Sequence, residues 1–179
     1  MQPRTVRLSD GRELLIRQAE ASDAAALLNH VEGMCTESDF TTWMPGEFSL
    51  TEEQEAELME QYRADDTKVF MVAIMDDVIA GTLSFSAGNR ERLRHRGEFG
   101  VGVRRHAWGN GIGGHLMDTL IAWARDGGVI KKINLRVRED NARAVELYRR
   151  KGFVLEGTVS REIAADGEFF AVHCMGLEL

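Results

Sequence analysis

The stretch Trp108-Gly109-Asn110-Gly111-Ile112-Gly113-Gly114-His115 holds four glycines within six residues and is the most informative part of the chain. The apolar segment 99–103 before it is typical of a strand. After it, apolar side chains recur at helical spacing over residues 112–124, which predicts a helix. Glycines at such a junction let a ligand approach the backbone, and the free N–H groups of a helix's first turn can hold a phosphate. The stretch therefore predicts an anion-binding loop.

The segments before this loop predict antiparallel strands and two helices. Paired strands are expected at residues 6–8 with 14–16 and at residues 68–74 with 78–85. Two helices are expected between these pairs, one beginning near Ser22 and one after the capping-box sequence that starts at Thr51.

The segments after the loop predict a change of strand direction. A strand is expected over residues 133–137, then a helix capped by Asn141 and ended by Gly152, then strands at 153–155 and 169–177. The strand–helix–strand order implies at least one parallel pair in a mixed sheet. No linker or repeat interrupts the chain, so we expect a single α+β domain spanning residues 1–179.

Two other glycine-rich loops have to be weighed against this interpretation. Taken literally, Gly109, Gly111 and Gly114 have the spacing of the dinucleotide-binding fingerprint, which would indicate a nucleotide-dependent oxidoreductase. That fingerprint begins immediately after a strand, whereas residues 104–108 intervene here. A Walker A loop is excluded because no Gly-Lys-Ser/Thr follows.

Three motifs in order resemble the GNAT superfamily of N-acetyltransferases. They are the strand Phe99-Gly-Val-Gly-Val103, the glycine loop, and Asn141-x-x-Ala-x-x-x-Tyr148-x-x-x-Gly-Phe153. The family's pyrophosphate motif is Gln/Arg-x-x-Gly-x-Gly/Ala. This chain departs from it in the first position, which is Trp108. Because backbone N–H groups hold the anion, we expect the tryptophan to be tolerated.

The resemblance implies a mixed, mostly antiparallel sheet with a central splayed parallel strand pair flanked by helices. It also implies variable N-terminal helices at about residues 21–66, an acetyl-CoA-binding core at about 68–152 and C-terminal strands at about 153–179. Segment 94–99 and the closing hairpin at 157–175 are similar to the branch that holds the spermidine and ribosomal-protein N-terminal acetyltransferases.

The resemblance also implies the residues of the site. Tyr148 would be the general acid that protonates the CoA thiolate, and Glu98 would take a proton from the amine through a water. Arg104 or Arg105 could add charge for a CoA phosphate. The residues expected to bind acetyl-CoA are Val101, Gly102, Val103, Gly109, Asn110, Gly111, Ile112, Gly113, Gly114 and Asn141.

Composition and charge limit the kinds of molecule that the protein is expected to bind. The formal net charge of −7 disfavours nucleic-acid binding, and no apolar run is long enough to cross a membrane. The two cysteines make neither a disulfide framework nor a zinc site, so we expect a cytoplasmic protein without a metal. An acidic block at residues 37–66 is complementary to a polyamine, and a basic strip at 90–105 suits a small anion.

The predicted function is acetyl-CoA-dependent transfer of an acetyl group to a primary amine by direct attack in a ternary complex. A polyamine, a peptide N-terminus and an amino acid all remain open as the acceptor, and a homodimer is compatible with the family. The alternatives are a non-catalytic CoA-binding regulatory module and, less favoured, the oxidoreductase.

Overall fold

One eight-stranded sheet organises the chain, in the strand order β1-β2-β3-β4-β5-β6-β8-β7. The structure is a computed structural model that describes all 179 residues. The strands are β1 (Arg4–Arg7), β2 (Glu13–Gln18), β3 (Lys68–Met75), β4 (Val78–Ala87), β5 (Arg96–Val103), β6 (Lys132–Arg138), β7 (Val154–Ala165) and β8 (Glu168–Glu178). Every neighbouring pair is antiparallel except β5 and β6. The mixed sheet expected from the sequence is therefore confirmed.

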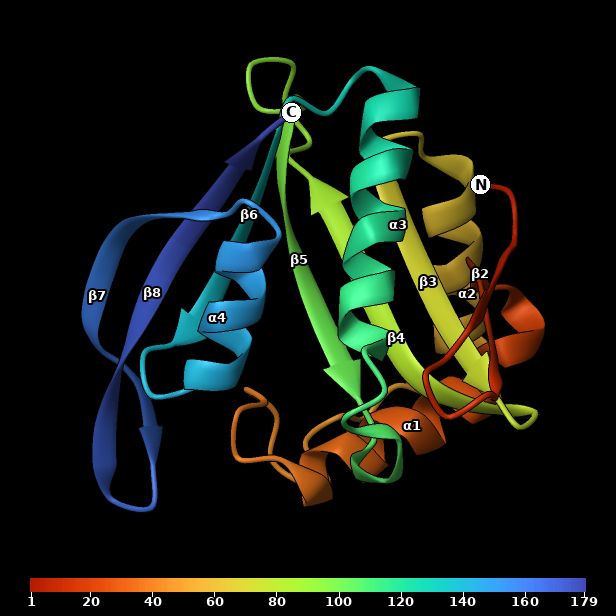
Figure 1. The fold of residues 1–179 in the computed structure, drawn as a ribbon, viewed down its shortest axis with the longest axis horizontal. Coiled ribbons are helices and arrows are strands. Elements are labelled where there is room, and N and C mark those ends of the chain that lie inside the picture. The colour runs from red at the N-terminus through yellow and green to blue at the C-terminus, as the bar shows by residue number, and fades with distance from the viewer.

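Four α-helices cover the two faces of this sheet. Helices α3 (Ile112–Gly127) and α4 (Ala142–Arg150) lie on one face, in front of the sheet in Figure 1, and α2 (Glu52–Ala64) lies behind it. Helix α1 (Ala24–Glu37) crosses the end of the sheet at which β5 finishes. The larger cluster of buried apolar residues lies under α3 and α4, and a smaller cluster joins Leu27 of α1, Met59 of α2 and Val72 of β3.

The parallel pair β5–β6 is short because the two strands separate. Their register covers only Arg96–Glu98 on β5 against Lys132–Asn134 on β6. Beyond these positions β5 stays paired with β4 as far as Val103, and β6 stays paired with β8 as far as Arg138. Two strand edges therefore face each other without a ladder, as expected for the splayed pair (Figure 1).

The capping signals in the sequence are borne out at two helices and wrong at a third. Thr51 and Gln54 form the expected capping box of α2, and the Asn141 side chain accepts the Ala144 N–H at 3.2 Å at the start of α4. Helix α1 is not capped by Ser22. A 3₁₀ turn precedes it, in which the Asp23 carboxylate accepts the Glu20 N–H at 2.8 Å and pairs with Arg17.

None of the helices is both long and apolar enough to span a bilayer.

Candidate acetyl-CoA and amine site

The glycine loop presents a row of unpaired backbone donors. Gly109 and Gly111 have φ values of +87° and +76°, a conformation that side chains rarely adopt, and helix α3 begins at Ile112. The first N–H bonded back to the loop is that of His115, which reaches the Gly111 carbonyl at 3.0 Å. None of the six N–H groups of residues 109–114 donates a hydrogen bond within the chain. Together with the helix dipole they form a site suited to a phosphate.

The loop lies against the end of β5 and against α4, which brings two of the expected cofactor-binding residues, Gly113 and Val103, close together. A Cβ on Gly113 would lie 3.8 Å from the Leu147 side chain of α4 and 4.0 Å from that of Val103 on β5. The unpaired edge of β5 begins after Glu98 and reaches this junction at Val103. The site therefore fits an extended ligand that carries a phosphate. The free N–H groups of the loop could hold the phosphate, and the free strand edges could pair with the rest of the ligand.

Tyr148 lies where these two strands separate. Its ring is 8% exposed and packs edge-on against Phe99, the first β5 residue beyond the parallel register, with the ring centroids 5.9 Å apart. Phe153 packs against the same ring at 6.1 Å. Burial raises the pKa of Tyr148 to about 12, so the phenol keeps its proton at neutral pH. The hydroxyl makes no hydrogen bond within the chain and is available to a ligand.

Glu98 lies on the opposite face of β5 from the Phe99–Tyr148 contact, because alternate strand residues point to opposite faces. Its side chain is exposed, and its cross-strand neighbours are Ser86 on β4 and Asn134 on β6. Ser86 shares a hydrogen bond of 2.8 Å with the Tyr62 hydroxyl of α2. The expected acid and base thus lie on the two sides of the opening between β5 and β6.

The same face of β5 leaves an open floor next to Glu98. A Cβ at Gly100 would meet only the Ser84 hydroxyl, at 3.8 Å, so the space above this residue is empty. At Gly102 the face is closed again, since a Cβ there would lie 1.9 Å from the Met34 sulfur of α1. The open stretch above Gly100 is therefore bounded by α1 at one end and Glu98 at the other.

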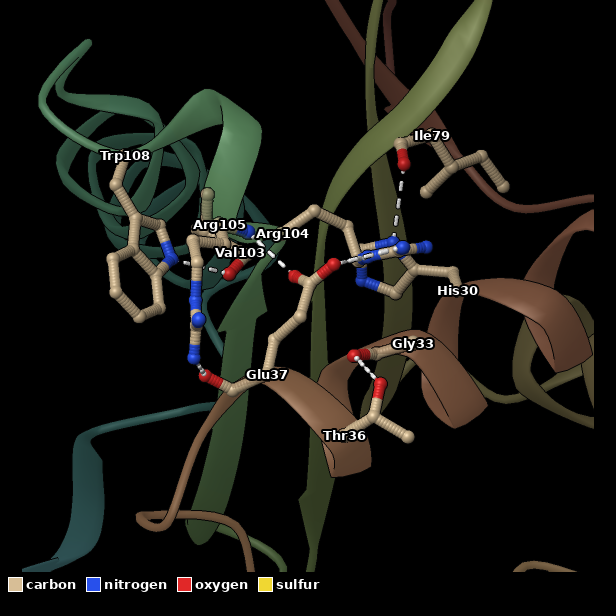
Figure 2. A network of polar contacts seen from close by, with 9 residues as sticks. All are labelled: His30, Gly33, Thr36, Glu37, Ile79, Val103, Arg104, Arg105 and Trp108. Atoms are coloured by element: carbon tan, nitrogen blue, oxygen red, sulfur yellow. Dashed lines mark hydrogen bonds and ion pairs between the residues drawn. The ribbon is translucent and has the colours of Figure 1, made fainter. Parts of the chain in front are cut away.

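A polar clamp ties α1 to the chain that enters the glycine loop. Figure 2 shows Glu37, the last residue of α1, between Arg104 and Arg105. Its carboxylate accepts from Arg104 Nε at 3.0 Å and Nη2 at 2.9 Å, and from the Arg105 backbone N–H at 2.6 Å. The Arg105 guanidinium donates to the Glu37 carbonyl. Both arginines, considered for a CoA phosphate, are thus already engaged by Glu37.

Trp108, which stands where the family motif has Gln or Arg, binds back to the end of β5. Its indole Nε1–H donates to the Val103 carbonyl at 2.7 Å, which closes the turn between β5 and the glycine loop (Figure 2). The Arg105 guanidinium lies over the indole, with Cζ 5.5 Å from the ring centroid. The departure from the motif therefore adds a link to β5 and leaves the backbone N–H groups free.

The sequence did not predict that two titratable residues of the N-terminal helices are buried. His30 of α1 is 1% exposed, shares a 3.1 Å hydrogen bond with the Ile79 carbonyl, and has its pKa lowered to about 4 by burial. Glu55 of α2 is also 1% exposed, its Oε2 has no partner, and burial raises its pKa. Glu55 stands in the acidic block that was expected to complement a polyamine, but its burial removes this carboxylate from the surface.

Comparison with known proteins places the chain in a family. Residues 25–153 match the acetyltransferase (GNAT) family, and the chain belongs to it. The sheet has a single parallel pair, so it is not the doubly wound sheet that accompanies the dinucleotide fingerprint.

Three relatives illustrate the range of similarity. The chain is 30% identical over 105 residues to an L-amino acid N-acetyltransferase of Escherichia coli, a match covering 59% of this chain and 65% of that protein, just under two thirds of its length. A GNAT acetyltransferase structure from Streptococcus pneumoniae is 33% identical with a TM-score of 0.89, over 93% of this chain and 99% of that one. The Salmonella typhimurium yncA structure with acetyl-CoA has a TM-score of 0.80 at 20% identity, over 92% and 93% of the two chains, and shows a shared fold.

Proposed function

We propose that this chain transfers the acetyl group of acetyl-CoA to a primary amine of a small molecule, in a ternary complex. The observation that carries the proposal is the row of six unpaired N–H groups at residues 109–114 beside a strand pair that separates. Family membership and the amino-acid acetyltransferase relative support the same activity. Acetyl-CoA would supply the acetyl group and the thiol leaving group.

The residues of the loop and β5 would bind and orient the cofactor. The N–H groups of residues 109–114 would hold the pyrophosphate, and the free edge over Val101–Val103 would pair with the pantetheine arm as an added strand. The Val101 N–H would donate to the thioester oxygen as charge develops there. The Val103 carbonyl already accepts a hydrogen bond from Trp108, and the side-chain oxygen of Asn141 already accepts the Ala144 N–H that caps α4. These two oxygens therefore have less capacity to accept hydrogen bonds from the ligand.

Tyr148 and Glu98 would handle the protons. Glu98 faces the open floor above Gly100 and would accept a proton from the ammonium group through a water. Tyr148 would donate to the sulfur from the other side of the opening. Because its pKa of about 12 lies above the roughly 8.5 of a thiol, the phenol stabilises the leaving thiolate mainly as a hydrogen-bond donor.

The experiment is release of CoA thiol from acetyl-CoA against a panel of polyamines, amino acids and peptide N-termini. Wild type is compared with Tyr148→Phe and Glu98→Gln, and with Glu60→Gln, an exposed carboxylate on α2, as the control. We expect turnover with one amine class and a loss of about tenfold or more in kcat for Tyr148→Phe.

Calorimetric titration with CoA separates the ways in which the assay can fail. Tight CoA binding with no turnover on any amine would favour the regulatory module over the enzyme. Absence of CoA binding would mean that the glycine loop has been misinterpreted. The homodimer and the cytoplasmic location stay predictions, and light scattering of the purified protein measures the first of them.

A further inference from the structure

A groove of about 480 Å³ lies on the face of the sheet that carries Glu98. Its floor is made by β5, β6 and β8, on the half of this face where no helix covers the sheet. The polar residues that line it are Arg96, Glu98, Lys132, Asn134, Arg136 and Glu156. Three of these are cations, so the groove differs in charge from the acidic chain as a whole.

Two of the three cations already have acidic partners. Lys132 Nζ lies 2.6 Å from Glu156 Oε1, and Arg136 is paired with Glu162 on β7. Arg96 makes neither an ion pair nor a side-chain hydrogen bond, although its side chain is exposed beside them. Of the two acidic residues in the groove, Glu156 is paired with Lys132, whereas Glu98 makes no ion pair and no side-chain hydrogen bond. The groove therefore holds one free cation and one free anion.

These two free charges lie in line with the open floor of the site. Arg96, Glu98 and Gly100 are alternate residues of one strand and share a face, with about 6.6 Å between successive Cα positions. Asn134 on β6 stands directly beside Glu98. Along the strand, Glu98 thus lies between the floor where transfer would occur and Arg96.

We propose that Arg96 binds the α-carboxylate of an amino-acid acceptor whose α-amine lies between Glu98 and the floor above Gly100. This inference rests on the proposed acetyltransferase function and names its acceptor class. In an α-amino acid the ammonium and the carboxylate are both attached to the α-carbon, and they match a free carboxylate and a free guanidinium two residues apart on one strand face.

The charge pattern disfavours the other two acceptor classes. A polyamine would bring a further cation toward Arg96, the cation of the groove that has no acidic partner, where like charges repel. A peptide N-terminus has an amide where an amino acid has its carboxylate, so the Arg96 guanidinium would lose its ionic partner.

The test compares each L-amino acid with its own amide, which keeps the amine and removes the carboxylate charge. In wild type we expect kcat/KM for the preferred amino acid to exceed that of its amide by roughly 10- to 100-fold, the range of a charge-assisted hydrogen bond. Arg96→Gln should remove that preference by raising KM for the acid with kcat little changed, because the carboxylate is not a reacting group. Arg96→Lys should restore part of it.

Arg92→Gln is the matched control, because Arg92 is exposed outside the groove and loses the same charge. An unchanged melting temperature for Arg96→Gln shows that the variant is folded. Equal use of acid and amide by wild type, or equal losses on both acceptors in Arg96→Gln, would overturn the inference. Turnover of polyamines or peptides but not amino acids would overturn it while the acetyltransferase stands. No turnover on any amine would overturn both.

Discussion

The clamp around Glu37 offers the sharpest test of how α1 and the glycine loop depend on each other. We consider Glu37→Gln, which keeps the size of the side chain and removes its charge. The carboxylate accepts three hydrogen bonds, of 3.0 and 2.9 Å from Arg104 and 2.6 Å from the Arg105 N–H. Substitution weakens all three and leaves the Arg104 guanidinium over Gly33 without its counter-charge.

The magnitude follows from the partial exposure of the pair. Both side chains are 22% exposed, so water screens part of the attraction. Hydrogen bonds to charged groups contribute about 1.5–3 kcal/mol when dry, and exposed ion pairs about 0–1 kcal/mol. A loss of about 1–2 kcal/mol is therefore expected, which lowers Tm by roughly 2–8 °C for a chain of this length. If about 1 kcal/mol of this orders the loop, KM for acetyl-CoA rises roughly fivefold.

The assay is thermal unfolding together with steady-state kinetics at varied acetyl-CoA. Glu60→Gln, with the same chemical change on the exposed face of α2, should leave both quantities at the wild-type value. Because Arg104 lowers the pKa of Glu37, the stabilisation is present above about pH 4.5 and is lost as the pH falls through the lowered pKa. A reduced Tm with an unchanged KM for acetyl-CoA would refute the coupling, since the clamp would then support only the helix.

Three further predictions concern buried titratable groups. Burial lowers the pKa of His30 to about 4, so the unfolded chain takes up the proton first and the free energy of unfolding should fall by ~3 kcal/mol from pH 6.5 to pH 4. Urea titrations of His30→Gln should lack most of that slope. Burial raises the pKa of Tyr148 to about 12, so stability present below pH 10 should decline by ~2–3 kcal/mol up to pH 12. In Tyr148→Phe the free energy of unfolding should depend less on pH between pH 10 and pH 12. The same dependence in wild type and variant would contradict the burial of the phenol. Glu55 is buried without a partner for Oε2, and its raised pKa means that its charge opposes folding at neutral pH. We expect Glu55→Gln to raise Tm at pH 7 by roughly 2–4 °C, and a lower Tm would mean that the carboxylate is satisfied in solution.

The sequence predicted those parts of the fold that local chemistry determines. The glycine loop, the Asp76-Asp77 turn with φ values of +53° and +62°, and the cap at Asn141 each depend on residues within a few positions of one another. The family resemblance supplied the splayed pair, and the structure shows how few residues β5 and β6 share. Ser22 was a wrong cap because residues 21–23 form a 3₁₀ turn ahead of α1, which the Asp23 carboxylate holds by accepting the Glu20 N–H and pairing with Arg17.

The parts that could not be predicted depend on contacts between distant segments. Glu37 and Arg104 are 67 residues apart, and the charged runs to which they belong suggested ligands for each residue but no contact between the two. Glu55 has exposed carboxylates around it in α2, and only the packing of α2 on α1 and β3 decides that it is the buried one. The hydrogen bond from Trp108 to the Val103 carbonyl could not be predicted, because it depends on the conformation of the turn between the two residues and the sequence does not show which carbonyl the indole N–H reaches.

The shortness of the β5–β6 register has a consequence for how the molecule resists unfolding. Across that line the strand register covers three residue positions on each strand, and side-chain packing among Phe99, Tyr148 and Phe153 adds to it. A ligand that pairs with both free edges would replace the missing backbone bonds and connect the two antiparallel halves. Stabilisation by such a ligand should therefore appear as slower amide hydrogen exchange on both sides of this line, in β4 and β5 as well as in β6 and β8.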